Sequence, residues 1–299
     1  MLAAAAGMLA ASAACGGGGS AAPAPPPSVQ NGQVTVDGQA RTFRVFVPPT
    51  LDQSRPAPVV LVLHGGGNSV DDMVKATGFD RQAGDGDFIA VYPAGLGRVW
   101  NAGTCCGSAP SRKVDDVAFL TKVLDQVEAD HKVDPARVFV TGVSNGAMMA
   151  YRFACERADR VTGVGSVAGA VVIDPCQPSR PVSVIEIHGT EDPLVPYDGG
   201  LVTFPQLQGT PEAGPYTATP AMIQSWTKID GCPVPTPAKM AAPVTTDLWV
   251  GCSNGSSVSL VTVQGGGHVW FGADLGPSDG AVDATSTIWR FFAGLHPTG

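Results

Sequence analysis

The chain has 299 residues, of which 44% are hydrophobic and 15% are charged, and its formal net charge is −8. This balance is typical of a globular protein and provides material for one large α/β domain. The acidic charge and the lack of any lysine- or arginine-rich run exclude the basic surface that nucleic-acid-binding proteins use. We expect a single domain that acts as a monomer, with no nucleic acid as a partner.

The chain begins with an apolar, alanine-rich segment over residues 1–14. Its length matches the hydrophobic part of a signal peptide and is too short to span a bilayer. Cys15 follows directly, and the run Ser12-Ala13-Ala14-Cys15 looks like a bacterial lipoprotein cleavage site, at which the cysteine is acylated. The sequence therefore predicts export, a lipid anchor on Cys15 at the membrane, a flexible tether over 15–33 and a catalytic domain over 34–299. A disordered tail is the alternative.

Short apolar runs and helical patterns then alternate along the chain. Residues 41–47 alternate in polarity as a half-buried strand does, whereas residues 59–63 are continuously apolar, as in a strand covered on both faces. Further apolar runs lie at 89–92, 138–140, 161–167, 182–187 and 258–263, and helical patterns lie at 116–131 and 281–295. This alternation predicts one doubly wound, mostly parallel sheet of the α/β class with right-handed crossovers.

A glycine-rich turn, His64-Gly65-Gly66-Gly67, follows the apolar run at 59–63 directly. Backbone without side chains leaves room for a carbonyl group to approach. We therefore expect the Gly66 N–H to be one donor of an oxyanion hole, with a purely structural turn as the alternative.

The next informative segment is VFVTGVSNGAMM at residues 138–149. Its pattern, G-x-S-x-G between a strand and a helix, is that of a nucleophile elbow, a sharp turn that lifts the serine hydroxyl clear of the backbone. The glycines two residues on either side avoid a clash between the closely packed strand and helix. Ser144 is the predicted nucleophile, and the N–H of Asn145, at the helix N-terminus, is the second predicted oxyanion donor.

Six cysteines remain after Cys15, and in an exported protein an even set favours disulfides over metal sites. Cys232 and Cys252 flank a proline-rich excursion and are expected to pair. Cys155 and Cys176 lie on elements that should be neighbours and form the second expected pair. Cys105 and Cys106 stay open, either as a vicinal bridge or each bonded elsewhere.

Polar residues that could serve a serine nucleophile follow two later strands. The run at 182–187 leads into His188-Gly189-Thr190-Glu191-Asp192-Pro193, and Asp192 is the predicted acid. Glu191 and Asp198 compete with it, and Asp192 could also merely close a turn. We interpret His188 as structural, hydrogen-bonded to loop backbone near the acid.

The predicted base is His268, because it comes straight after the run at 258–263, where a loop can deliver it over the sheet. His296 also follows Asp192, but it lies beyond the last helix near the chain end. The long Gly- and Pro-rich segment at 196–220 is expected to be a functional loop at the carboxyl edge of the sheet.

Over about residues 41–295 the chain resembles the poly(3-hydroxybutyrate) depolymerase-like esterases of the α/β-hydrolase superfamily, which are related to secreted feruloyl and acetylxylan esterases. The motifs that carry the resemblance are, in order, LHGGG, WNAGTCCG followed by VDDVAFL, DPARVFVTGVSNGAMMAYRFAC, SVIEIHGTEDPLVPYDGG and GGGHVW. The resemblance implies the α/β-hydrolase fold and a catalytic triad of Ser144, Asp192 and His268. It also implies a substrate pocket lined by Trp100, Asn101 and Trp270, with ordinary packing as the alternative for both tryptophans.

The implied activity is that of a secreted serine carboxylester hydrolase that works through an acyl-enzyme, with no cofactor and no metal. Polyhydroxybutyrate oligomers or polymer are one substrate class, and feruloyl or acetylxylan esters are the alternative. Acyl transfer to an alcohol on the same triad and, more remotely, a non-catalytic surface protein also stay open. We expect no substrate-binding domain after the helix at 281–295, and solid polyester is therefore the less favoured form of substrate.

Overall fold

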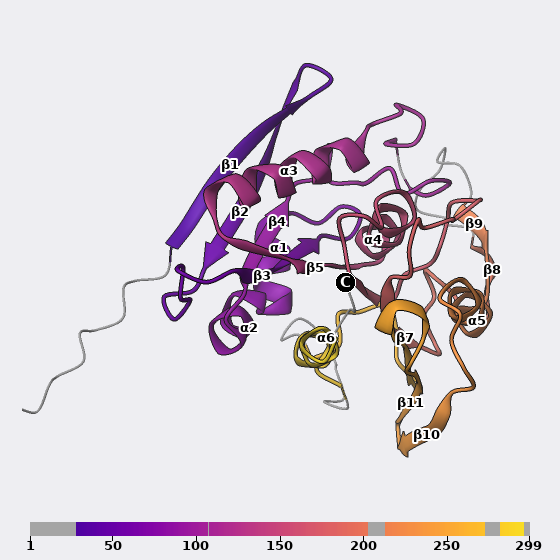
Figure 1. The fold of residues 1–299 in the computed structure, drawn as a ribbon. Coiled ribbons are helices and arrows are strands. Elements are labelled where there is room, and N and C mark those ends of the chain that lie inside the picture. The colour runs from indigo at the N-terminus through magenta and orange to yellow at the C-terminus, as the bar shows by residue number, and fades with distance from the viewer. Residues whose placement is uncertain (1–27, 107, 203–212, 273–281, 296–299) are drawn as a thin grey trace, which may run out of the picture.

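A ten-stranded sheet forms the centre of the protein (Figure 1). The computed structural model describes residues 28–106, 108–202, 213–272 and 282–295. The predicted signal peptide, the lipidation site at Cys15 and the competing base His296 lie outside the described residues.

Six neighbouring strands at the middle of the sheet run parallel, and two antiparallel strands flank them on each side. This arrangement confirms the predicted doubly wound, mostly parallel α/β sheet. In sheet order the strands are β1 (Ser28–Val36), β2 (Gln39–Val47), β4 (Ile89–Pro93), β3 (Ala57–Leu63), β5 (Val133–Val143), β6 (Gly163–Val167), β7 (Ser183–Gly189), β12 (Val258–Val263), β11 (Val244–Trp249) and β10 (Thr236–Ala241). A separate antiparallel pair consists of β8 (Gly200–Val202) and β9 (Ala213–Tyr216).

Helices cover both faces of the sheet. They are α1 (Val70–Thr77), α2 (Phe79–Gly86), α3 (Asp116–Asp130), α4 (Asn145–Glu156), α5 (Thr219–Ile229) and α6 (Ala284–Ala293). A short 3-10 turn, η1 (Ser253–Gly255), lies between β11 and β12. One hydrophobic cluster joins α3, α4 and α5 to the sheet, and a second joins α1, α2 and α6 to it. Figure 1 accordingly shows α5 and α6 on either side of β7 and β11.

The continuously apolar runs form the strands that the helices cover. Every residue of β3 and of β7 is buried, which is what coverage on both faces requires. The predicted helices at 116–131 and 281–295 correspond to α3 and α6, and Asp115 caps α3 by accepting a hydrogen bond from Ala118 N at 2.8 Å.

The predicted boundary between tether and domain is wrong by six residues, because β1 already begins at Ser28. The sequence of this strand is polar, and most of its residues are exposed, so it lacks the apolar signal of the inner strands. Pairing with β2 defines it instead, and the ring of Phe43 lies over Gly32, where any side chain would collide with it.

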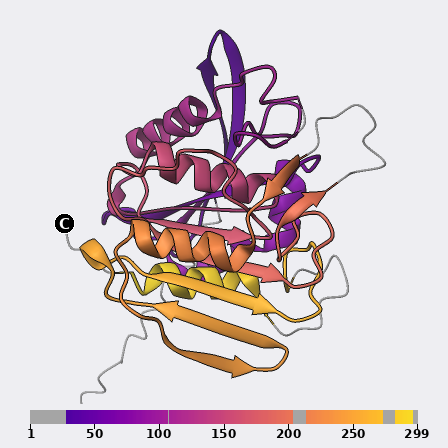
Figure 2. The same cartoon turned by 90° about the vertical axis from the view of Figure 1, so that its right-hand side faces the viewer.

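The proline-rich excursion between Cys232 and Cys252 is a hairpin of β10 and β11 that extends the sheet. Figure 2 shows this hairpin and the hairpin of β1 and β2 at opposite ends of the molecule. The segment 196–220, expected as one long loop, contains β8 and β9 and reaches the start of α5. Within the described ranges no helix is long and apolar enough to cross a membrane.

Candidate active site

Ser144 lies in the sharp turn between β5 and α4. Its backbone has φ 55° and ψ −124°, a left-handed conformation that a residue with a side chain rarely adopts. The Ser144 N–H donates to the carbonyl of Val167 at 2.9 Å, which fixes the turn against β6.

The two glycines of the motif are required by close backbone contacts. A Cβ on Gly142 would lie 2.6 Å from the carbonyl carbon of Gly146, and a Cβ on Gly146 would collide with the carbonyl oxygen of His64. The strand, the helix and the turn after β3 therefore approach one another as the predicted nucleophile elbow demands.

Asp192 and His268 form a direct pair. The Nδ1 of His268 lies 2.7 Å from Oδ2 of Asp192, so this nitrogen donates to the carboxylate. Asp192 follows β7 and His268 follows β12, and these strands are parallel neighbours whose carboxyl ends share the edge on which β5 delivers Ser144. The competing acids Glu191 and Asp198 are exposed instead.

The Asp192 carboxylate is buried and richly hydrogen-bonded. Its Oδ1 accepts from the N–H groups of Leu194 and Val195, each at 2.8 Å. Burial works to raise the pKa of Asp192, but hydrogen bonds from His188 and His268 and the charge on His268 outweigh it and hold the pKa well below its usual range. The group is therefore a carboxylate, which can orient the His268 ring and stabilise its protonated form.

The two predicted oxyanion donors lie close together. A Cβ on Gly66 would be 3.7 Å from Cβ of Asn145, and Gly66 is exposed, so its backbone is open to a ligand. Asn145 is the first residue of α4, where helix N–H groups have no partner within the helix. In the part of the chain that the structure describes, the Gly66 N–H donates no hydrogen bond.

The loop that carries Trp100 and Asn101 is tied to the elbow. The side chain of Asn145 accepts from the Trp100 N–H at 2.7 Å and donates to the Trp100 carbonyl at 3.1 Å. The Asn101 side chain donates to the carbonyl of Val114 at 2.9 Å, and its backbone N–H donates to Asp116 at 2.7 Å. The side-chain amide of Asn145 is thus occupied by Trp100, whereas Asn101 is partly exposed and its side chain makes one hydrogen bond, to Val114.

Both tryptophans of the expected pocket are packed inside the protein. Trp100 is wholly buried, and its indole N–H donates to the His64 carbonyl at 2.8 Å. Trp270 is 6% exposed, and its indole N–H donates to Thr285 at 3.0 Å. These positions fit ordinary packing, the alternative that the sequence left open.

His64 is a residue whose role the sequence reasoning missed. Its Nε2 accepts from the Gly95 N–H at 2.9 Å, so its Nδ1 carries the proton and donates to the Gly65 carbonyl at 2.8 Å. Burial lowers the pKa of His64, which keeps the ring neutral and preserves this pattern. The ring thereby shapes the turn that presents Gly66. The position of His64 at the start of the HGGG motif was the one feature of the sequence that could have indicated this role.

The interpretation of His188 as structural is confirmed, because its Nε2 donates to the carbonyl of Val195 at 2.8 Å. The sequence reasoning missed what surrounds this ring. Glu186 and Tyr151, both buried, form a polar cluster with it beneath the sheet edge.

Two disulfides join the predicted partners, Cys155 to Cys176 and Cys232 to Cys252. Cys105 and Cys106, left open by the sequence, pair with each other. The Cys155–Cys176 bond anchors the end of α4, the helix that begins beside Ser144, to the segment after β6. In the described ranges no group of three or more histidine, cysteine and acidic side chains could hold a metal ion.

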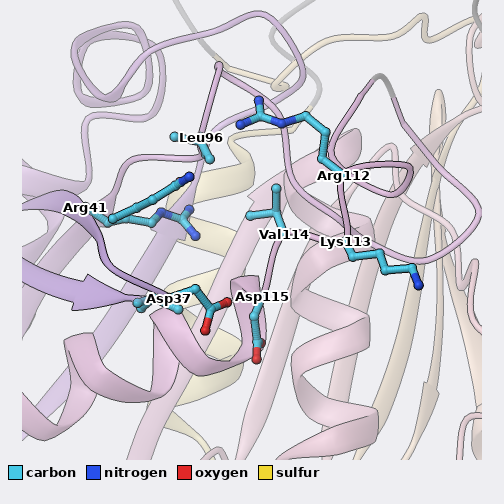
Figure 3. Close-up of a pocket in the computed structure, with 9 residues that line it drawn as sticks. Asp37, Arg41, Leu96, Arg112, Lys113, Val114 and Asp115 are labelled. Carbon is cyan, nitrogen blue, oxygen red and sulfur yellow. The ribbon is translucent and has the colours of Figure 1, made fainter.

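A cavity of about 310 Å³ lies beside the hairpin of β1 and β2 (Figure 3). Its lining residues are Val36, Asp37, Gln39, Arg41, Leu96, Arg112, Lys113, Val114 and Asp115. None of the predicted site residues is among them, and the charges around it are of both signs. Arg41, one of the lining residues, forms a buried ion pair with Asp116 at 2.7 Å.

Comparison with known proteins agrees with this geometry. Residues 41–203 match the family described as "Esterase PHB depolymerase". The chain belongs to this family. Its members are carboxylic ester hydrolases by description, so the protein is an esterase.

Individual relatives span most of the chain. It is 30% identical over 286 residues to "Putative esterase NocK" of Nocardia uniformis subsp. tsuyamanensis, which covers 88% of this chain and 82% of that protein. It is 29% identical over 275 residues to feruloyl esterase C of Emericella nidulans, which covers 89% of this chain and 87% of that protein.

Solved structures show the same fold at lower identity. An acetyl xylan esterase from Aspergillus awamori superposes with a TM-score of 0.60 at 15% identity, over 89% of this chain and 99% of that chain. A CE1 ferulic acid esterase from Anaeromyces mucronatus in complex with ferulic acid superposes with a TM-score of 0.56 at 16% identity, over 90% of each chain. This esterase therefore has the predicted α/β-hydrolase fold.

Proposed function

We propose that this esterase is a serine carboxylester hydrolase that works through an acyl-enzyme, with Ser144 as nucleophile, His268 as base and Asp192 as acid. The observation that carries the proposal is the Asp192–His268 hydrogen bond of 2.7 Å at the sheet edge that also presents the strained Ser144 turn. A serine needs a base oriented by an acid to attack an acyl carbon at neutral pH, and this pair supplies both.

The reaction has two halves. In the first, Ser144 Oγ attacks the ester carbonyl carbon while Nε2 of His268 takes the hydroxyl proton, and the alcohol then leaves with that proton. In the second, water attacks the acyl-enzyme, His268 takes its proton, and the acid is released as Ser144 recovers its hydroxyl. The N–H groups of Asn145 and Gly66 hold the oxyanion in both halves.

For the substrate we propose esters of hydroxyalkanoate oligomers, with feruloyl or acetylxylan esters as the second candidate class. The family description supports the first class, and the names of the relatives support the second. Trp100 and Trp270 would act by shaping the site rather than by exposing their rings to substrate, since both are buried and their indole N–H groups are bonded internally. Asn101 is partly exposed and stays the candidate for a side-chain contact with substrate.

We also propose that the protein is exported and anchored through a lipid on Cys15. The apolar segment at 1–14 supports export, and so do the three disulfides, which persist in oxidising compartments. Intact-mass analysis of the protein from its own kind of host should show an acyl modification on Cys15. An unmodified Cys15 in membrane-free enzyme would contradict the anchor.

One panel assay tests the activity and the substrate class. Wild type and Ser144→Ala would be compared on nitrophenyl esters of increasing acyl length, methyl ferulate, acetylated xylan and soluble hydroxybutyrate oligomers. Hydrolysis that Ser144→Ala abolishes supports the proposed function, and the substrate with the highest kcat/KM identifies the class. Turnover that survives in Ser144→Ala would contradict it. An added alcohol acceptor reveals the acyltransferase alternative, because an ester product would then replace the free acid.

A further inference from the structure

Next to Asp192 lies a chain of buried polar groups that the proposed reaction does not use. It consists of His188 and Glu186 on β7 and Tyr151 on α4, and all of these side chains are at most 1% exposed. Buried ionisable groups are costly unless their contacts are complete. Their contacts therefore reveal which of them carry charge.

Both ring nitrogens of His188 face acceptors. Nδ1 lies 2.8 Å from Oε1 of Glu186, and Nε2 lies 2.8 Å from the carbonyl oxygen of Val195. A neutral imidazole has a single N–H, so it would leave one of these contacts as two acceptors facing each other. An imidazolium satisfies both.

The Glu186 carboxylate is surrounded by donors. The Tyr151 hydroxyl donates to Oε2 at 2.9 Å, and the Gly169 N–H donates to Oε1 at 3.2 Å, in addition to the contact from His188. Three donors directed at one carboxyl group favour its anionic form. The shared proton therefore belongs on the ring of His188.

His188 reaches Asp192 in two ways. Its Nε2 lies 3.4 Å from Oδ2 of Asp192, the oxygen that accepts from His268. The same nitrogen holds the carbonyl of Val195, whose N–H binds the other oxygen of Asp192. The His188 ring thus contacts both the Asp192 carboxylate and the loop on which Asp192 lies.

We propose that His188 is a positioning residue, a buried imidazolium fixed by Glu186 that keeps the Asp192 carboxylate ionised and correctly placed for His268. This inference rests on the proposed function of Asp192 and His268. In this arrangement the Asp192 carboxylate contacts two imidazole rings. His268 exchanges a proton during catalysis, whereas His188 keeps both of its protons.

The remaining neighbours agree with a fixed cation. Thr219 at the start of α5 places its hydroxyl 3.4 Å from Nδ1 of His188, and the ring of Tyr197 meets the imidazole edge-on at 5.9 Å between centroids. Tyr216 stays neutral, since burial and the charge of Asp192 raise its pKa to about 12. Ser166 of β6, in register with Glu186, adds a hydroxyl without a charge. Among the residues that the structure describes, the acidic side chains that contact the ring are thus Glu186 and Asp192.

The balance of these effects supports a lasting charge. Burial alone lowers the pKa of His188, but the hydrogen bonds that the ring donates to Asp192 and Glu186, together with the charge of Glu186, outweigh it and raise the pKa to about 10. The ring should therefore keep both protons over the whole pH range in which a serine esterase works.

The test combines histidine NMR with a pH profile of activity. Wild-type protein labelled with ¹⁵N in its histidines should show, at about pH 9, one ring with both nitrogens protonated. That signal should be missing in His188→Gln and should change to a neutral tautomer in Glu186→Gln, whose amide can donate to Nδ1 of a neutral ring. A wild-type spectrum with only neutral rings at about pH 9 would overturn the proposal.

Glu186→Gln is the decisive variant for activity. It keeps the shape of the side chain but removes the negative charge that holds the second proton on the His188 ring. Losing a positive charge beside Asp192 makes protonation of His268 easier, so the acidic limb of the kcat/KM profile should move to higher pH by about half to one unit. Asp230→Asn is the matched control, because it also changes a buried acid to its amide but lies away from the site. The acidic limb of its kcat/KM profile should coincide with that of wild type. An unmoved limb in Glu186→Gln would also overturn the proposal.

The two arms separate this inference from the proposed function. If wild type hydrolyses no ester in the panel, the proposed function fails, while the NMR arm still decides the protonation of His188. If His188→Gln does not fold, the change of the same signal in Glu186→Gln identifies the ring.

Discussion

The side chain of Asn145 binds the main chain of Trp100 twice, accepting from its N–H and donating to its carbonyl. Asn145 also follows the proposed nucleophile, Ser144, in sequence, so one residue both begins α4 and ties the 95–101 loop to the elbow. The backbone N–H of Asn145 and its side chain thus have separate duties, and substitution can separate them.

Asn145→Ala should therefore lower kcat without removing the oxyanion donor itself. The change leaves a buried N–H and a buried carbonyl of Trp100 without partners, at a cost of about 1–3 kcal/mol in the free energy of unfolding. We expect kcat to fall by about 10- to 100-fold as the loop loosens. Urea unfolding and steady-state kinetics measure both effects. Asn145→Asp keeps the acceptor for the Trp100 N–H and should lose less; an equal loss in both variants would contradict a role for that bond.

The proposed triad predicts a much larger effect on kcat. Ser144→Ala and His268→Ala should each reduce kcat by roughly 10⁴- to 10⁶-fold, because members of a catalytic unit lose nearly all of its contribution together. The double variant should be no slower than the single ones by more than about 10-fold. Circular dichroism would verify that the fold is intact. Normal turnover by either single variant would exclude the mechanism.

We predict that Asp230 makes the free energy of unfolding depend on pH, through a titration outside the proposed active site. Burial raises the pKa of Asp230 to about 7, and the side chain is fully buried, with Val182 N–H on one oxygen. The folded protein therefore binds a proton that the unfolded chain has already released above about pH 4, so the free energy of unfolding falls as pH rises from about 4 to about 7.

Asp230→Asn removes this titration. Relative to wild type, the variant should gain about 2–4 kcal/mol between about pH 4 and pH 8, because the amide needs no proton to remain buried. Urea unfolding of both proteins across this range measures the difference. A constant difference at every pH would show that Asp230 does not hold the proton.

The two longer-range disulfides offer a comparison at nearly constant loop length, since their sequence separations are 21 and 20 residues. If restriction of the unfolded chain dominates, opening either bond should cost about 3 kcal/mol. Paired Cys→Ser variants, followed by thermal unfolding, test this. Peptide mapping without reductant should find no free thiol at Cys232 or Cys252, and free thiols there would contradict the oxidised state.

Periodicity and motif spacing predicted the inner part of this fold well. The runs around 59–63 and 182–187 are buried on both faces, so their composition alone marks them as strands, and the polar residues that follow them meet at one edge. The prediction failed at the sheet margins. There β1 and the β10–β11 hairpin are polar or partly exposed, and pairing with a neighbour, which local sequence does not encode, defines them.

The same distinction holds at the site. Asp192 and His268 were identifiable because catalytic order and strand ends restrict the choice, and the structure joins them. The contacts of His64, His188 and Glu186 could not be anticipated, because they depend on which backbone carbonyls and carboxylates a buried ring meets after folding. Local sequence likewise does not distinguish a tryptophan that packs inside the protein, such as Trp100, from one that contacts substrate.

The left-handed backbone of Ser144 means that activity and thermodynamic stability compete at one position. Glycine adopts this conformation without penalty, whereas a residue with a Cβ loses roughly 1–2 kcal/mol there. A Ser144→Gly protein would therefore be expected to be more stable than the enzyme, and Ser144→Ala would keep the strain while losing the nucleophile. A serine in this turn therefore carries a conformational cost, and the proposed role of Ser144 as nucleophile accounts for that cost.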